Sequence, residues 1–98
     1  MRHRLSRRAD RDVESLYRRS IAEHGEAHAD RYYDGLLDSF RWIENHPLAA
    51  RERTEQGRSV RIHHYGVHAV IYSILADDTI LIVRVLHGRQ DLRRGLRP

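Results

Sequence analysis

Cysteine is absent from this 98-residue sequence, which excludes disulfide bonds and cysteine-bound zinc. The same absence fits a reducing compartment such as the cytoplasm. The N-terminal segment "MRHRLSRRAD" contains no apolar stretch of the kind that forms a signal peptide. The longest apolar runs are only as long as a strand, well short of the ~20 residues that cross a membrane. We therefore expect a cytoplasmic protein that makes no membrane contact.

Lysine is also absent, so all 18 basic residues are arginine. Two explanations are open: GC-rich coding, or a functional need for planar, bidentate contacts to carboxylate and phosphate. The charge is unevenly distributed, because residues 1–8 carry four arginines and no acid, whereas residues 84–98 carry five arginines and one acid. The 9 arginines between these ends accompany 13 acidic residues. Basic ends of this kind suit an acidic partner, either nucleic acid or an acidic peptide.

Length and composition predict one domain with a modest core. The chain is 40% hydrophobic and 33% charged, a balance typical of a folded protein rather than a disordered one. One core is usual at this length, and a bound partner could contribute much of the working stability. We therefore assign residues 1–98 to a single domain and treat residues 89–98 as a basic C-terminal tail.

The N-terminal half has helical periodicity. The segment "RHRLS" alternates like an edge strand, and Ser6 at its end is placed to cap a helix. Gly25 predicts the end of this first helix, and a second helix is expected over residues 26–45, because Pro47 prevents its continuation. We expect the two helices to form an antiparallel hairpin. Its expected apolar contacts are Ala9, Val13, Leu16, Tyr17, Ile21, Ala29, Tyr33, Leu36, Leu37, Phe40 and Ile43.

The C-terminal half has strand character. The segments "RSVRIHHY", "VHAVIYSIL" and "TILIVRVLH" are rich in β-branched residues, with a break at Gly66 and a turn at Asp77 and Asp78. The polar segment before them, "PLAARERTEQG", is expected to be a loop. The last two strands are almost continuously apolar, as is typical of central strands. The predicted fold class is therefore α+β, in the order β-α-α-β-β-β, with the helical hairpin packed on a small, mainly antiparallel sheet.

The common metal-binding and nucleophilic patterns are missing. Of the eight histidines, His63, His64 and His68 are close in sequence, and strand alternation predicts His64 and His68 on one face with His63 on the other. No acid or cysteine is near them in sequence, whereas hydrolytic zinc sites need three protein ligands. Neither Ser59 nor Ser73 has an activating base nearby in sequence, and no glycine-rich phosphate loop or GxSxG turn is present. We expect neither a metal nor a cofactor.

Residues 84–92, "RVLHGRQDL", concentrate chemically useful side chains at the end of a strand. Cleavage of RNA needs a base for the 2′-hydroxyl, a cation for the phosphate and an acid for the leaving oxygen. Basic residues at solvent-facing strand positions are also common without any function, so spacing alone leaves both interpretations open. The residues that could supply part of the RNA-cleaving set are Arg58, Arg61, Arg84, His87 and Arg89.

Four features resemble the RelE/ParE toxin superfamily, and the ParE branch most closely: the order of elements, "LSRRADRDVESLYRRSIAEHGEAHADRYYDGLLDSFRWIENHP", "VHAVIYSI" and "ILIVRVLHGRQDLRRGL". The resemblance covers nearly the whole chain, and "IVRVLHGRQDL" is its most specific part. It implies the toxin of a type II toxin–antitoxin module. RelE-like members cut mRNA in the ribosomal A site, whereas ParE-like members poison DNA gyrase and trap a cleaved DNA complex. The fold alone therefore leaves the activity open.

Two positions depart from the nuclease pattern that the resemblance implies. RelE-type nucleases carry an arginine just before the core of the "VIY" strand, where this sequence has Ala69, and a tyrosine after the last strand, where it has Leu92. Loss of one electrostatic donor of this kind lowers a rate by roughly 10²–10³. We therefore expect a non-enzymatic inhibitor of DNA gyrase. The expected contacts with gyrase or DNA are Arg84, His87, Arg89, Arg93, Arg94 and Arg97.

The resemblance also implies a cognate ParD-like antitoxin, with operator DNA reached only through that antitoxin. An acidic and apolar antitoxin segment is expected to cover the helical hairpin and the sheet edge. Two other functions stay open: a ribosome-dependent mRNA endoribonuclease of the RelE type, and an inactive member that acts only in antitoxin binding and autoregulation. The expected antitoxin contacts are Arg18, Arg19, Arg58 and Arg61.

Overall fold

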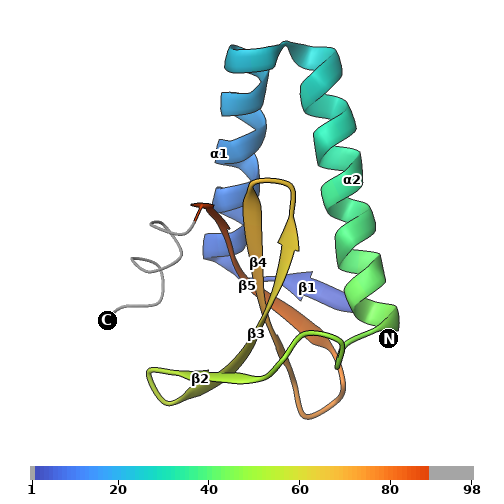
Figure 1. Cartoon of the computed structure of the whole chain (residues 1–98), viewed down its shortest axis with the longest axis vertical. Helices are drawn as coiled ribbons and strands as arrows, with labels where there is room; N and C mark the ends of the chain where they lie inside the picture. Colours follow the sequence, from blue (N-terminus) through green and yellow to red (C-terminus); the bar gives the residue numbers. More distant parts are fainter. Residues whose placement is uncertain (1, 89–98) are drawn as a thin grey trace.

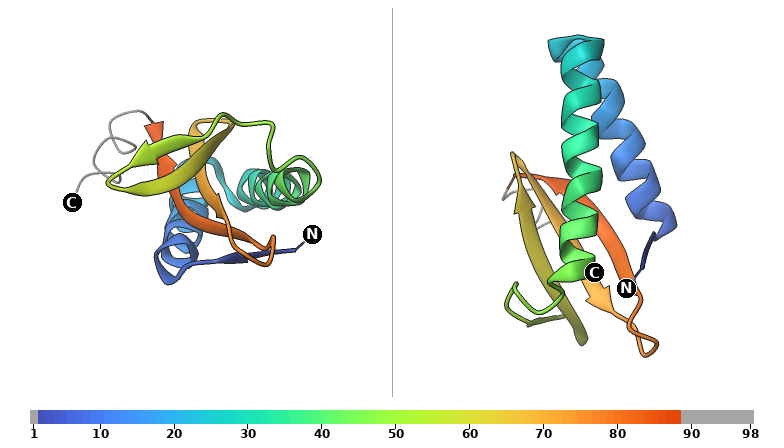
Figure 2. Two further views of the ribbon diagram at one scale, coloured as in Figure 1. Left: turned by 90° about the horizontal axis from the view of Figure 1, so that it is seen from below. Right: turned by 90° about the vertical axis from the view of Figure 1, so that its right-hand side faces the viewer.

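A computed structural model of the protein describes residues 2–88. Both helices lie on one side of a five-stranded sheet and extend beyond its end (Figures 1 and 2). The predicted α+β class, with a helical hairpin followed by the main strands, is therefore confirmed. The elements are β1 (His3–Leu5), α1 (Arg7–His24), α2 (Glu26–Asn45), β2 (Arg53–Glu55), β3 (Arg58–Tyr65), β4 (His68–Ile74) and β5 (Ile80–His87).

The strand order of the sheet is β1-β5-β4-β3-β2. Strands β2 to β5 are connected in sequence and pair antiparallel, as a meander. Strand β1 joins the opposite edge and pairs parallel with β5, with His3 opposite Ile80. The apolar strands β4 and β5 lie inside the sheet, and β1 lies at its edge, as the sequence predicts. Burial on both faces explains why β4 and β5 read as continuous apolar runs.

The prediction of an uninterrupted loop over residues 47–57 was wrong, because this segment contains β2. Residues Arg53–Glu55 pair with the first three residues of β3. Gln56 and Gly57 connect the two strands with positive φ values of 54° and 78°, which suits a two-residue hairpin turn. The strand is short and polar, and its register comes from the turn and from pairing. No alternation of apolar and polar residues could therefore reveal it.

The helical hairpin has the caps that the sequence predicts. The Ser6 side chain accepts a hydrogen bond from the Ala9 amide at 3.0 Å and begins α1. Gly25 separates the helices with a φ of 86°, and its amide donates to the Ile21 carbonyl at 2.9 Å. Tyr17 of α1 donates to Asp30 of α2. This hydrogen bond raises the pKa of Tyr17 to about 12 and joins the helices near their connection.

The main core lies between the hairpin and the sheet. Phe40 and Ile43 of α2 are fully buried against Val70 and Tyr72 of β4 and other strand residues. Ile21, the last residue of the apolar spacing of α1, is 37% exposed. The end of α1 that carries it extends past the sheet (Figure 1). A second cluster, formed by Val60, Ile71 and Leu86, packs on the opposite face of the sheet.

The predicted arrangement of the clustered histidines was wrong. His63 pairs across the strands with Val70, whose side chain belongs to the core under the helices. His68 lies two residues before Val70 and shares that face, whereas His64 faces the other side. The cause is the turn between β3 and β4, where Tyr65 pairs with His68. The chain reverses there, so the alternation counted along β3 does not continue into β4.

Candidate functional site

Arg84 is bound inside the protein by Asp12 of α1. Its Nε and Nη2 donate to the two carboxylate oxygens of Asp12 at 2.7 and 3.0 Å. Both side chains are 16% exposed. Hydrogen bonding to Asp12 raises the pKa of Arg84, so the guanidinium stays charged. The contact with gyrase or DNA that the sequence assigns to Arg84 stays a prediction, since the structure shows an internal role.

Side chains of the first turns of α1 cover the edge of β5 that β1 leaves open. Strand β1 pairs only with residues 80–82 of β5. Beyond them, Ser6 Oγ donates to the Val83 carbonyl at 2.7 Å, and the Val85 amide donates to Asp12 at 3.0 Å. An unpaired strand edge is a template for pairing with another chain. Here α1 satisfies these backbone groups and fixes the position of Arg84.

Tyr32 of α2 and His68 of β4 form a polar pair where the hairpin meets the end of the sheet. The Tyr32 hydroxyl is 2.7 Å from His68 Nδ1 and accepts from the Val67 amide at 3.2 Å. Burial, followed by the nearby charges of His87 and Arg19, lowers the pKa of His68 to about 4. His68 is therefore neutral near pH 7. In that state the ring carries one proton, and the Tyr32 hydroxyl has a second acceptor within reach, the Tyr65 carbonyl at 3.2 Å.

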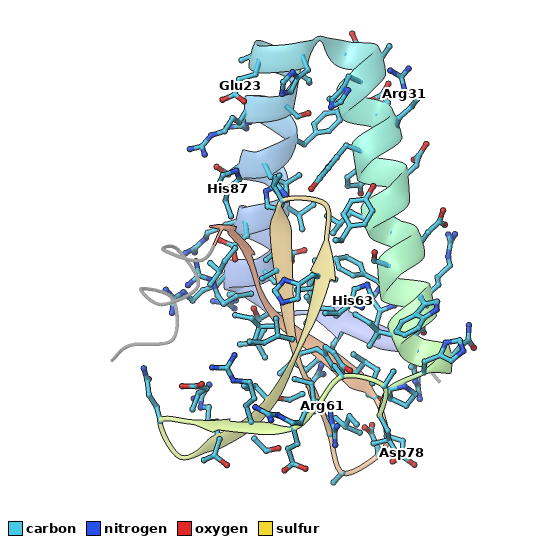
Figure 3. The ribbon with its side chains drawn as sticks, viewed as in Figure 1. Glu23, Arg31, Arg61, His63, Asp78 and His87 are labelled. Atoms are coloured by element: carbon cyan, nitrogen blue, oxygen red, sulfur yellow. The ribbon has the colours of Figure 1, made fainter. Side chains whose placement is uncertain are left out.

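A groove of about 540 Å³ opens beside this pair, between α1 and the ends of β4 and β5. One face of α1 forms one side, and residues 84–87 of β5 form part of the other. His87 is exposed at the end of β5, beside α1 (Figure 3), and its ring centroid is 5.2 Å from that of His68. The groove therefore brings two predicted target contacts, Arg84 and His87, close to one predicted antitoxin contact, Arg19.

The predicted antitoxin contacts occupy two separate regions. Arg18 and Arg19 are exposed on α1, whereas Arg58 is exposed on β3. The Arg61 side chain is only 15% exposed and donates to the Ala50 carbonyl at 2.6 Å, so it holds the segment before β2. The second half of α1 and the β2–β3 hairpin lie at opposite ends of the molecule (Figure 1). A partner that contacts both regions would extend over much of the 39 Å length of the protein.

An aromatic cluster that sequence reasoning missed lies at the end of α2. Trp42 is 42% exposed. Its ring centroid is 4.5 Å from that of His46 and 5.1 Å from that of His63 of β3, and both rings stack on it. Burial lowers the pKa of His63. The spacing of four residues between Trp42 and His46 was the available signal.

The sheet carries no arginine at the position where the nuclease pattern has one. Ala69 is 3% exposed and pairs with His64 on one side and Leu86 on the other. Ile71 lies on the same face, in the apolar cluster with Leu86. Leu92, the second departure from that pattern, lies outside the described residues. The same holds for the predicted target contacts Arg89, Arg93, Arg94 and Arg97.

The described part of the chain has neither a cluster of metal ligands nor a helix that could span a membrane. Within residues 2–88, no three histidine or acidic side chains come close enough together to hold a metal ion. Neither helix in this range combines the length and the apolar character needed to cross a bilayer.

Comparison with known proteins identifies the family. The family model described as "ParE toxin of type II toxin-antitoxin system, parDE" matches residues 4–92. The solved structure described as "Chromosomal ParDE TA system from P. aeruginosa" is similar with a TM-score of 0.75 at 14% identity, over 91% of this chain and 97% of that chain. Curated protein sequences gave no match. The structural likeness shows the fold, the family match confirms the resemblance seen in the sequence, and the chain belongs to the ParE toxin family of type II toxin–antitoxin systems.

Proposed function

We propose that the protein is a toxin that inhibits DNA gyrase without being an enzyme, and that a cognate antitoxin neutralises it. The observation that carries this proposal is the match of the ParE toxin family to residues 4–92. Members of this branch act on gyrase, as the resemblance of the sequence already implies. An antitoxin partner follows from the toxin–antitoxin family itself.

The environment of Arg84 and Ala69 supports an inhibitor over a nuclease. A nuclease of the RelE type needs a cation free to hold the scissile phosphate. Arg84 is bound through two hydrogen bonds to Asp12, and Ala69 stands where the nuclease pattern has an arginine. Capture of a phosphate by Arg84 would require breaking a mostly buried ion pair, which is energetically costly. The runner-up, a ribosome-dependent endoribonuclease, has correspondingly less support.

The target contact that we propose begins at the end of β5. His87 is exposed there, and the basic segment 89–98 follows it in the sequence with four arginines and one acid. Such a concentration of positive charge suits DNA phosphate or an acidic patch on gyrase. The proposed antitoxin contacts remain Arg18, Arg19 and Arg58, whose side chains are exposed, together with the more buried Arg61.

A pair of assays on purified protein tests the proposed function. One assay measures supercoiling of relaxed plasmid by gyrase and the accumulation of cleaved DNA. The other measures cleavage of ribosome-bound mRNA in a purified translation system. We expect inhibited supercoiling with more cleaved DNA, reversal by the cognate antitoxin, and intact mRNA. Cleavage of mRNA with gyrase unaffected would contradict the proposal and support the endoribonuclease. Inactivity in both assays, with antitoxin binding intact, would indicate an inactive family member that acts only in antitoxin binding and autoregulation.

A further inference from the structure

Five aromatic rings form a continuous chain along the groove between α1 and the ends of β4 and β5. Each of the five residues lines that groove. From the tip of the hairpin to the end of β5, the rings are His24, His28, Tyr32, His68 and His87. The centroids of successive rings in this order are 4.7, 6.5, 5.4 and 5.2 Å apart.

The groove also carries a surplus of positive charge. Arg8 and Arg19 are exposed and lie on the face of α1 that lines the groove, about three helical turns apart. Arg84 is the third arginine of the lining, and its charge is balanced by Asp12. Glu23 is the other acidic residue of the lining. Counted without the histidines, the lining therefore has three arginines against two acidic residues, a surplus of one positive charge.

We propose that this groove binds single-stranded nucleic acid, with backbone phosphates near Arg8 and Arg19 and bases against the exposed histidine rings. Surfaces that hold single strands combine cations along the backbone with aromatic faces on which bases stack, and this groove has both. An acidic peptide would satisfy the charge but would make no use of the exposed histidine rings as stacking partners.

The binding test uses the purified chain and a short fluorescein-labelled oligothymidylate, about 12 nucleotides long, within the site sizes of single-strand binding folds. Fluorescence anisotropy would report the affinity. We expect a rise in salt from about 50 to about 200 mM to weaken binding roughly 7-fold, as neutralisation of two phosphates by Arg8 and Arg19 implies. A labelled oligoglutamate peptide of the same length serves as the acidic-peptide probe.

Two neighbouring arginines provide a matched pair of variants. Arg19→Ala removes a cation that lines the groove. Arg18→Ala removes the same charge one position earlier, from a side chain that pairs with Glu14 and does not line the groove. We expect Arg19→Ala to reduce the slope of log affinity against log salt by about 0.7, the contribution of one phosphate on a single strand. Arg18→Ala should leave that slope unchanged.

Two exposed histidines test the stacking. His28→Ala removes a ring of the chain on α2, whereas His64→Ala removes an exposed ring on the other face of the sheet. We expect His28→Ala to weaken oligonucleotide binding about fivefold, the lower end of the loss for one stacked base, and His64→Ala to have no effect. Thermal melting of every variant would confirm that the fold is intact.

Three outcomes would overturn the proposal. The first is absence of oligonucleotide binding at low salt. The second is an equal loss for Arg18→Ala and Arg19→Ala, which would assign binding to the overall charge of the protein. The third is tighter binding of oligoglutamate with the same response to the variants, which would make the groove a peptide site. Gyrase enters none of these measurements, so a failure of nucleic-acid binding leaves the proposed inhibition of gyrase untouched. A failure of gyrase inhibition likewise leaves nucleic-acid binding by the groove untouched.

Discussion

Single side chains decide how α1 is joined to the sheet. Asp12 accepts three hydrogen bonds, two from the Arg84 guanidinium and one from the Val85 amide. Ser6 caps α1 and also donates to the Val83 carbonyl. Each of these residues connects a local helical feature to a strand that comes more than 70 residues later in the chain. Their loss would therefore affect tertiary structure as well as the helix.

Replacement of Asp12 by alanine should lower the free energy of unfolding by roughly 2–4 kcal/mol. The reason is that Arg84 and the Val85 amide would lose their acceptor in a part of the protein that is mostly closed to water. Chemical denaturation would measure the loss. Glu14→Ala is the control, because the Glu14–Arg18 pair is exposed and should contribute at most about 0.5 kcal/mol. Equal losses for both variants would contradict the structural role of Asp12.

His68 should make the protein less stable in mild acid. Its pKa is lowered to about 4 by burial and by His87 and Arg19, so between about pH 6.5 and 4 the unfolded chain binds a proton that the folded chain excludes. Stability is full above about pH 6.5 and falls with decreasing pH, by about 1 kcal/mol between pH 7 and 5 after allowance for partial solvent exposure.

Denaturation curves measured at several pH values test this role of His68. His68→Asn should flatten the pH dependence, because asparagine cannot bind the proton. His64 is exposed on the other face of the sheet, so His64→Asn should leave the His68 contribution to the pH dependence of stability unchanged. The charged and titratable groups around His68 come from four elements: Arg19 of α1, Tyr32 of α2, Tyr65 of β3 and His87 of β5. If the free energy of unfolding of His68→Asn fell with decreasing pH as steeply as that of the unmodified protein, His68 would not be the group responsible.

At the scale of elements, the contact between α2 and β3 depends on a missing side chain. Gly35 lies inside α2, where a glycine is normally unfavourable. A Cβ atom at this position would lie 1.9 Å from the Tyr65 hydroxyl and 2.7 Å from Cζ of the same ring. The Tyr65 hydroxyl in turn donates to the Tyr32 carbonyl at 3.2 Å. The glycine therefore allows the tyrosine of β3 to reach the backbone of α2.

Gly35→Ala should destabilise the protein by about 1–2 kcal/mol, even though alanine alone would favour the helix by about 1 kcal/mol. The methyl group would displace the Tyr65 ring and break its hydrogen bond to the helix. Thermal melting of single and double variants would check this. In a Tyr65→Leu background the same glycine replacement should stabilise the protein, because the obstructing ring is gone. A higher melting temperature for Gly35→Ala alone would show that Tyr65 moves aside at little cost.

At the scale of the whole molecule, the described core and the proposed target contact draw on different parts of the sequence. Among residues 2–88, the buried residues of both apolar clusters lie between Ala9 and Leu86. The proposed target contact continues from His87 into residues 89–98, whose structure lies outside the described part of the chain. Folding and gyrase inhibition are therefore expected to depend on different parts of the sequence.

Truncation after Gly88 should leave a folded protein that binds antitoxin but no longer inhibits gyrase. The removed segment holds Arg89, Arg93, Arg94 and Arg97 but only Leu92 and Leu96 as large apolar residues. Full-length protein with Arg93→Glu and Arg94→Glu should lose inhibition similarly, since charge carries the contact. Thermal melting, antitoxin affinity and supercoiling would be measured on the same samples. A truncated protein that melts normally and still inhibits gyrase would exclude the tail as the contact.

The sequence by itself determined both helices, four of the five strands and the family. Ser6 and Gly25 set the limits of the first helix through a side-chain cap and a positive φ, and both effects involve only neighbouring residues. The apolar runs of β4 and β5 predicted central strands because burial on both faces leaves no room for polar residues. The segment "IVRVLHGRQDL" carried the resemblance that the family match confirms.

Only the tertiary structure decided which side chains meet. Arg84 and Asp12 are separated by 72 residues, and the five rings of the groove come from both helices and two strands. His63 and His68 lie on the same face of the sheet because the chain reverses between β3 and β4. Strand β2 forms through pairing with β3 and has no apolar pattern of its own. Contacts of this kind depend on how distant elements pack, and the order of residues within one element carries no direct record of that packing.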